Sequence, residues 1–237
     1  MNASDIIYFL AGAAVLILAV ALVCRIIDSS GGEEENGGGD GTSRGKTYEV
    51  RRDRVVRKNE PGPLRVLFMS EQKRAGRRGE KRASRAIETV LRDEDMLFTG
   101  LRIEHEGSRA EFDNIVVNRY GVFIIEVKDW SGTLSGGIDD PEWKKTKITG
   151  AGNVYTKYEK NPVKQVNRQA GILARWLRSN GVNVWVRGFV LLLQGNSPTE
   201  DAALLRNVSE VGRAVHTPGR KTLDGATAGE IVRLLER

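Results

Sequence analysis

The apolar residues of the chain form one long uninterrupted run first, and the shorter patterns of a folded domain only later. Residues 6–24 are 19 uncharged, mostly apolar residues. A helix rises about 1.5 Å per residue, so a run of this length crosses the roughly 30 Å hydrocarbon layer of a bilayer. Because Asp5 precedes the run and "VCRII" follows it, the pattern favours an uncleaved anchor over a cleaved signal peptide. We therefore predict a single transmembrane anchor at residues 1–27.

Residues 28–60 separate this anchor from the next apolar pattern. They begin with "DSSGGEEENGGGDGTSRGK", which is rich in Gly, Ser and acids and has no apolar period. Such composition is typical of a flexible tether. The stretch "GTSRGKT" is not a phosphate-binding loop, because Asp40 stands where that motif needs Gly and no strand precedes it. We predict a tether at residues 28–60 and one folded domain at residues 61–237.

Helical and extended patterns follow one another in the first half of this domain. Residues 79–93 carry apolar residues at helical spacing and predict an amphipathic helix, with Glu80 on its apolar stripe. Four extended runs follow, and the Gly and Asn residues between them predict a meander of antiparallel strands. These runs begin at Leu97, Ala110, Gly121 and Gly132.

The second half of the domain adds helices and one buried strand. Asn161 as N-cap and Pro162 at the first helical position predict a second long helix. Residues 184–193 are almost continuously apolar, which is typical of a strand buried on both faces. Thr227 and Glu230 form a capping box that predicts a final helix. The order is helix, three or four strands, helix and strand, which predicts an α/β sandwich around one sheet.

Two of the predicted strands carry charged residues among apolar ones. A two-residue hairpin loop before Gly121 would place Asp113 opposite Glu126, with Lys128 on the same face. Directly opposed carboxylates destabilise a sheet unless a cation lies between them. A three-residue loop with a Gly bulge would instead turn Asp113 to the other face, and the sequence leaves both registers open. Two carboxylates beside an amine suit Mg²⁺-dependent phosphodiester hydrolysis in outline.

Composition and charge narrow the choice of chemistry. One Cys and two widely separated His residues exclude a disulfide framework and make His- or Cys-based metal chemistry improbable. From Arg44 to Arg92 there are 16 basic and 6 acidic residues, a balance of +10 against +6 for the whole chain. A segment of this charge can bind anionic lipid or nucleic acid. Because basic residues follow the anchor and none precedes it, we expect the N-terminus outside and the domain in the cytoplasm.

Longer stretches of the sequence resemble a known family. The segments "RRGEKRA", "EFDNIVVNRYGVFIIEVKDWSGTLSG" and "NPVKQVNRQAGIL" follow in the order and spacing of the NERD, or nuclease-related, domain. Asp113 and Glu126-Val127-Lys128 resemble the Asp...(Asp/Glu)-x-Lys signature of the PD-(D/E)xK nucleases, although Phe112 replaces the usual Pro. The resemblance covers a core at about residues 76–194. It implies a restriction-endonuclease-like α-β-β-β-α-β core on one mixed sheet, followed here by a C-terminal helical extension.

The resemblance also implies which residues form an active site on nucleic acid. A divalent metal, Mg²⁺ or Mn²⁺, would lie on Asp113 and Glu126, with Lys128 beside the attacking water. Glu80 and Gln165 would orient metal-bound water or phosphate from the flanking helices. Basic residues beside Glu80 are expected to contact nucleic acid, and they are Arg77, Arg78, Lys81 and Arg82.

Three functions remain as hypotheses. The first is a membrane-anchored, divalent-metal-dependent nuclease of DNA or RNA. The second is a non-catalytic module of the same fold that binds nucleic acid or a protein partner at the membrane. The third is a protein whose basic stretch, including Arg51, Arg52 and Arg54, binds anionic lipid. The carboxylate cluster favours the first hypothesis.

Overall fold

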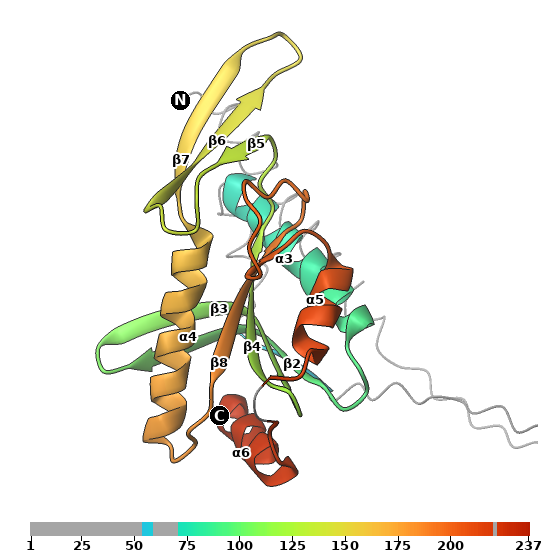
Figure 1. Ribbon diagram of the computed structural model, residues 1–237, viewed down its shortest axis with the longest axis vertical. Helices are drawn as coiled ribbons and strands as arrows, with labels where there is room; N and C mark the ends of the chain where they lie inside the picture. Colours follow the sequence, from blue (N-terminus) through green and yellow to red (C-terminus); the bar gives the residue numbers. More distant parts are fainter. Residues whose placement is uncertain (1–53, 59–70, 220–221) are drawn as a thin grey trace, which may run out of the picture. The chain divides into compact units, whose positions relative to one another are not determined.

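The computed structural model describes residues 54–58, 71–219 and 222–237, which all lie in the compact unit Glu49–Arg237 (Figure 1). Apart from three strands inserted before the second helix, the core follows the order that the sequence predicted. In chain order, the elements are β1 (Val55–Arg57), α3 (Glu71–Val90), β2 (Met96–His105), β3 (Ser108–Asn118), β4 (Gly121–Lys128), β5 (Thr133–Ser135), β6 (Glu142–Ile148), β7 (Val154–Lys160), α4 (Pro162–Ser179), β8 (Val186–Leu192), β9 (Leu204–Leu205), α5 (Val208–His216) and α6 (Gly225–Glu236).

The main sheet has six strands in the order β1-β2-β3-β4-β8-β9. Strands β2, β3 and β4 form the predicted antiparallel meander, whereas β1, β8 and β9 each lie parallel to their neighbour. The α/β class and the mixed sheet are therefore as predicted. Because β8 is parallel to β4, the carboxyl ends of these two central strands meet at the same edge of the sheet.

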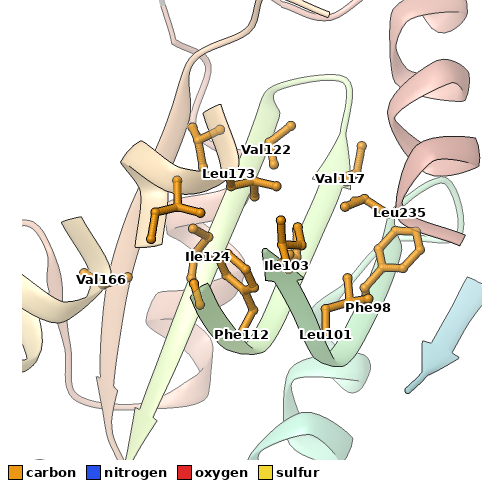
Figure 2. Packing of buried hydrophobic residues seen from close by; sticks show 14 of the residues in the cluster. Phe98, Leu101, Ile103, Phe112, Val117, Val122, Ile124, Val166, Leu173 and Leu235 are labelled. Carbon is orange, nitrogen blue, oxygen red and sulfur yellow. The ribbon is translucent and has the colours of Figure 1, made fainter. Parts of the chain in front are cut away.

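Apolar side chains cover both faces of this sheet. On one face, α4 and α6 contribute Val166, Leu173 and Leu235 to a cluster that also contains Phe112 and Ile124 (Figure 2). On the other face, α3 and α5 pack a second cluster against the same strands. Burying one such large side chain stabilises a fold by about 1.5–3 kcal/mol, so two filled faces fix the helices firmly onto the sheet.

Helix α4 forms as its sequence predicted. The side chain of Asn161 accepts the N–H of Val163 at 2.9 Å, and Pro162 occupies the first turn, where its missing N–H has no partner to lose. The Asn161 amide also donates to the carbonyl oxygens of Gly137, Ile138 and Asp140. The same residue therefore caps the helix and fixes the loop between β5 and β6.

The expectation of one sheet was wrong. Residues Thr133–Ser135, expected as a fourth strand of the meander, instead pair with β6 in a separate sheet of order β5-β6-β7. The long β6–β7 hairpin of this sheet extends away from the main sheet beyond the first turn of α4 (Figure 1). The charged and polar residues of this hairpin, "EWKKTKI" and "VYTKYEK", lack the apolar character by which the other strands were recognised.

Two helices begin at other residues than predicted, and one helix was not predicted. Helix α3 begins at Glu71, eight residues before the predicted start, because its first turns are rich in helix-favouring Glu, Lys and Arg although they lack apolar spacing. Helix α6 is capped by Asp224, whose Oδ1 accepts the N–H of Thr227 at 2.8 Å, so Thr227 is not the cap. Helix α5 was not predicted, although Asn207 caps it and bonds the N–H of Glu210.

The two N-terminal predictions fall mainly outside the described residues. Residues 6–24 and most of the predicted tether are not among them, but Val55–Arg57 of that tether forms β1 at the edge of the sheet. This end of the tether is therefore part of the fold. Among the helices that the structure describes, none combines the length and the apolar content that crossing a bilayer requires.

Candidate active site

Asp113 lies where β3 changes the face that its side chains present. Side chains alternate along a regular strand, so residues three apart point to opposite faces. Phe112 and Ile115 nevertheless pack in the same apolar cluster, and so do Phe98 and Leu101 of the neighbouring β2. Both strands therefore shift their alternation at the same level of the sheet. Irregularities of this kind are common next to functional sites, because they turn one side chain in a new direction.

Gly100 makes this shift possible. Its φ of 66° is a conformation that Gly adopts readily, and a Cβ on it would lie 2.4 Å from the carbonyl oxygen of Lys58. The carboxylate of Asp113 turns toward β4, where its Oδ2 accepts the backbone N–H of Val127 at 2.8 Å. The side chain of Asp113 thus takes the place of a regular strand contact and is fixed beside the end of β4.

The hairpin register is the one that brings the acids together. Strands β3 and β4 pair from Asn118 with Gly121 to Asn114 with Ile125, which leaves a loop of two residues. The register with the two-residue loop is confirmed, and the alternative with a Gly bulge is wrong. Beyond the last of these pairs, Asp113 is close enough to Glu126 for the charge of Glu126 to raise the pKa of Asp113.

Glu126 is the centre of a hydrogen-bond network at the end of β4. It is 3 % exposed, and its Oε1 accepts hydrogen bonds of 2.6 Å from both Lys128 Nζ and Gln165 Nε2. Lys128 Nζ also donates to Gln165 Oε1 at 3.1 Å. On the other side, Gln169 Nε2 donates to Glu126 Oε2 at 2.8 Å. A buried carboxylate held by one ammonium and two amides is a fixed negative group rather than a mobile surface acid.

Regular geometry explains how two elements supply this network. Alternation along β4 places Glu126 and Lys128 on the face that α4 covers. In α4, Gln165 and Gln169 are four residues apart, and side chains at this spacing lie on the same side of a helix. The apolar residues Val166 and Leu173 seat that side of α4 on the sheet. The packing of the core therefore sets the positions of the polar groups.

Two acids of the site have raised pKa values. Burial raises the pKa of Asp113 well above its usual range, and the charges of Glu126 and Glu80 raise it further, against the opposing effects of the Val127 N–H and Lys128. Burial also raises the pKa of Glu80, which Arg77 lowers and the charges of Glu126 and Glu111 raise. Glu80, Asp113 and Glu126 therefore form one cluster of mutually repelling carboxylates, drawn from α3, β3 and β4.

The predicted basic residues lie on the two middle turns of α3, on either side of Glu80 in the sequence. Arg77 is close enough to act on the charge of Glu80. Arg82 donates to Asp129 Oδ2 at 3.0 Å, just beyond β4, and thereby connects α3 to the strand that carries Glu126. Arg78 and Lys81 are exposed on α3. The structure thus places Arg77 near Glu80 and Arg82 against Asp129.

Two Trp residues adjoin the site in different ways. Trp143 is fully buried and its Nε1 donates to the carbonyl oxygen of Gly137 at 2.8 Å, which is a core role. Trp130 packs edge-on against Trp143, with ring centroids 6.5 Å apart. Lys128 Nζ and Lys145 Nζ each lie 5.7 Å from the centre of the Trp130 ring. Trp130 therefore joins the candidate site to the inserted sheet.

Gln169 is the residue of the network that sequence reasoning missed. It is 3 % exposed and also donates to the carbonyl oxygen of Glu111 at 2.9 Å, while its own Oε1 has no hydrogen-bond partner. Both partners of the amide nitrogen only accept hydrogen bonds, which fixes the orientation of the amide. The available signal was its position one turn after Gln165 on the apolar face of α4, where a polar residue requires a partner.

The donor set of this site resembles that of a hydrated Mg²⁺ site more than that of a closed metal cage. Among the described residues, no group of three or more His, Cys, Asp or Glu side chains is arranged to hold a metal ion. Mg²⁺ usually binds through one or two carboxylates and keeps several water molecules. Asp113 and Glu126 are two carboxylates from adjacent strands whose mutual repulsion a divalent cation would relieve. These residues therefore fit Mg²⁺ or Mn²⁺.

Comparison with known proteins adds one finding. The model of the family described as "Nuclease-related domain" (NERD) matches residues 75–193 of the chain. This range is half of the 237 residues and contains Glu80, Asp113, Glu126, Lys128 and Gln165. No curated protein and no solved structure matches the chain.

Proposed function

This chain belongs to the nuclease-related domain family, and from that premise we propose that it is a membrane-anchored, divalent-metal-dependent nuclease that hydrolyses phosphodiester bonds in DNA or RNA. The observation that carries the proposal is the convergence of Asp113, Glu126 and Lys128 at the end of one hairpin. A hairpin that served only to build the core would have no need to bury repelling carboxylates, because burying a charge costs free energy.

Each residue of the site has a role in this proposal. Asp113 and Glu126 would hold Mg²⁺ or Mn²⁺, which would polarise the phosphodiester and favour formation of hydroxide from bound water. Lys128 would lie beside the attacking water and supply positive charge to the developing phosphorane-like transition state. Gln165 would orient Glu126 and Lys128 through its amide, since it bonds both side chains. Glu80 would orient water or phosphate from the α3 side.

Positive charge at the site would attract the substrate. A scissile phosphate is an anion and would be repelled by an uncompensated cluster of carboxylates. A divalent cation together with Lys128 and the basic residues of α3 would reverse the sign of the local field. These α3 residues are Arg77, Arg78, Lys81 and Arg82, which we propose as contacts to the nucleic-acid backbone.

The anchor gives the proposed nuclease its location. Residues 6–24 are long and apolar enough to span a bilayer, and the basic residues that follow them favour a cytoplasmic domain. We propose that the chain crosses the membrane once, with its N-terminus outside. The nuclease domain would then act on nucleic acid close to the inner surface of the membrane.

A second candidate function is favoured by one observation. The ammonium of Lys128 already neutralises Glu126 at 2.6 Å within the protein. Because this ion pair already balances the charge of Glu126 without a metal, the domain could be a non-catalytic module that binds nucleic acid or a protein partner. This candidate predicts that nucleic-acid binding survives in Asp113→Asn and that neither wild type nor variant needs a metal.

A metal titration separates the two candidates. Mg²⁺ and Mn²⁺ are titrated calorimetrically into the full chain in mild detergent and into Asp113→Asn, and each protein is then incubated with labelled single- and double-stranded DNA and RNA. The nuclease proposal predicts metal binding and cutting by the wild type and the loss of both in Asp113→Asn.

Glu104→Gln is the matched control for this titration. Glu104 is an exposed carboxylate of β2 that pairs with Arg109, away from the cluster. The control should bind metal and cut nucleic acid as the wild type does. A wild type that binds no metal and cuts none of the four substrates would leave the non-catalytic module as the better account.

A further inference from the structure

The β6–β7 hairpin exposes large apolar and aromatic side chains together with positive charge. Within the hairpin, here called the arm (residues 142–160), five Lys residues stand against two Glu residues, a net charge of +3. The exposed large apolar side chains of the described residues are concentrated on this arm, which carries Ile148, Val154, Tyr155 and Tyr158, each at least 60 % exposed. Soluble proteins bury such residues or use them for binding.

Pairing across the arm places each Tyr beside a Lys. Lys144 lies opposite Tyr158, and Lys147 lies opposite Tyr155. Residue numbers of opposite parity lie on opposite faces of a strand, so each face of the arm carries one Lys–Tyr pair. An aromatic ring beside an ammonium is the combination by which proteins bind single-stranded nucleic acid, through base stacking and phosphate contacts.

The lysines of the arm fall into two groups. Lys145 and Lys157 both pair with Glu159, at 3.5 and 2.8 Å. Within the described part of the chain, Lys144, Lys147 and Lys160 form no ion pair. Two lysines therefore have a structural partner, whereas three remain available to an anionic ligand.

The arm leads directly to the candidate active site. At its base, the buried Trp143 packs edge-on against Trp130. The ring of Trp130 lies 5.7 Å from Lys145 of the arm and 5.7 Å from Lys128 of the site. At its C-terminal end, β7 is followed by Asn161 and then by α4, which carries Gln165. A polymer bound along the arm would therefore pass Trp130 on its way to Lys128.

We infer that the arm binds a single-stranded segment of nucleic acid and guides it into the site. The strand would cross the edge of this two-stranded hairpin, so that Lys147 and Tyr155 contact a phosphate and a base on one face and Lys144 and Tyr158 do so on the other. The choice of nucleic acid over a membrane surface rests on the positions of the two Tyr rings along the hairpin and on the continuity of the arm with Lys128. This inference extends the proposed function, because it names the substrate class as a strand with accessible bases.

Binding without cutting tests the inference. The full chain in mild detergent is titrated with fluorescent single-stranded and duplex oligonucleotides in EDTA, at several salt concentrations. Each lysine that contacts a phosphate of a single strand contributes about 0.7 to the slope of log K against log salt. The variant Lys144→Gln/Lys147→Gln should therefore flatten the slope by about 1.4.

The control removes the same charge elsewhere. Arg175 and Arg178 are exposed on the last turns of α4, about 20–24 Å along the helix from its first residue and at the opposite end from the arm (Figure 1). Arg175→Gln/Arg178→Gln should leave the slope as it is in the wild type. An equal slope in the arm variant and the wild type, or an equal change in the control, would overturn the inference.

The aromatic residues give a second readout. Tyr155→Ala/Tyr158→Ala should weaken single-strand binding tenfold or more and leave duplex binding within about twofold, because only a single strand offers open base faces. Unchanged single-strand affinity would contradict the stacking role.

A membrane-surface role for the arm has its own signature. An environment-sensitive dye on Ile148→Cys, in a Cys24→Ser background, should respond to single-stranded oligonucleotide. A blue shift with phosphatidylserine vesicles and no response to oligonucleotide would overturn the inference in favour of lipid binding.

This test is separable from the test of cutting. EDTA removes the metal that the proposed chemistry requires, so the arm can be assessed whether or not the protein cuts. Arm-dependent binding in a protein that never cuts would uphold the inference and refute the proposed nuclease. If the protein cuts nucleic acid but its arm variants bind it as the wild type does, the proposed nuclease is upheld and the inference about the arm is refuted.

Discussion

Replacing Gln169 with Met tests whether the buried amide network holds Glu126 in place. The Gln169 amide donates to Glu126 Oε2 at 2.8 Å and to the carbonyl oxygen of Glu111 at 2.9 Å, and its own oxygen has no partner. Met has a similar length and can occupy the same 3 % exposed site, so the change removes polar contacts with little change in volume.

The magnitude follows from the two hydrogen bonds and the unpartnered oxygen. A hydrogen bond to a charged group contributes about 1.5–3 kcal/mol and a neutral one about 0.5–1.5 kcal/mol. Removing the unpartnered oxygen of Gln169 returns about 1–3 kcal/mol, because a buried polar group without a partner is destabilising. We expect Gln169→Met to lower the free energy of unfolding by about 1–2 kcal/mol.

A double-mutant cycle with Glu126→Gln isolates the contact itself. In Glu126→Gln the bond from Gln169 becomes neutral, so the cycle should give a coupling free energy of about 1–1.5 kcal/mol, the difference between a charged and a neutral bond. The assay is urea unfolding of the full chain in mild detergent, followed by tryptophan fluorescence. Asn167→Met, an exposed change on α4, should be additive with Glu126→Gln within about 0.5 kcal/mol. Additive effects for Gln169 as well would refute the network.

Three further predictions concern charge, packing and chemistry. The pKa of Asp113 is raised in the folded state, so its ionisation lowers stability as pH rises from the unfolded value of about 3.9 toward the folded pKa. Asp113→Asn should therefore stabilise the metal-free protein by about 0.5–2 kcal/mol at pH 7, and this gain in stability should vanish near pH 4. Thermal unfolding of the variant and the wild type at pH 7 and at pH 4 measures the gain. Gly188→Ala would place a Cβ 2.8 Å from Val166 Cγ2 and should lower the free energy of unfolding by about 1–3 kcal/mol. Gly229→Ala in α6, with nothing within 4 Å, should raise it by up to about 1 kcal/mol. Urea midpoints that do not move in opposite directions would contradict the packing. Lys128→Met should abolish cutting while metal titration still shows binding, and retained cutting would remove Lys128 from the proposed chemistry.

The sequence predicted the parts of this fold that bury apolar residues in a regular pattern. The helices over Ala83 and Leu173, the meander and the buried strand at Val190 all lie where apolar spacing indicated them, because that spacing is what packs against the sheet. The inserted sheet was missed for the same reason. Its strands are exposed on most of their surface, and Trp143 is its only fully buried large side chain among the described residues.

The sequence indicated some residues that the structure brings together, but it did not indicate all of their geometry. The resemblance to the family pointed to Glu126, Lys128 and Gln165. The structure joins these three side chains by direct hydrogen bonds. The face change at Asp113 could not be anticipated, because it depends on the conformation of Gly100 in another strand. Contacts between distant segments of this kind leave no local pattern in the sequence.

The rate of cutting by Asp113→Asn tests the central claim most directly. A labelled oligonucleotide of the type that the wild type cuts is incubated with excess protein in Mg²⁺, and the single-turnover rate is compared among the wild type, Asp113→Asn and Glu104→Gln. The account predicts that Asp113→Asn cuts at least about a hundredfold more slowly while Glu104→Gln keeps the wild-type rate. Equal rates for wild type and Asp113→Asn, or cutting that persists in EDTA, would contradict a metal-dependent nuclease site at this hairpin.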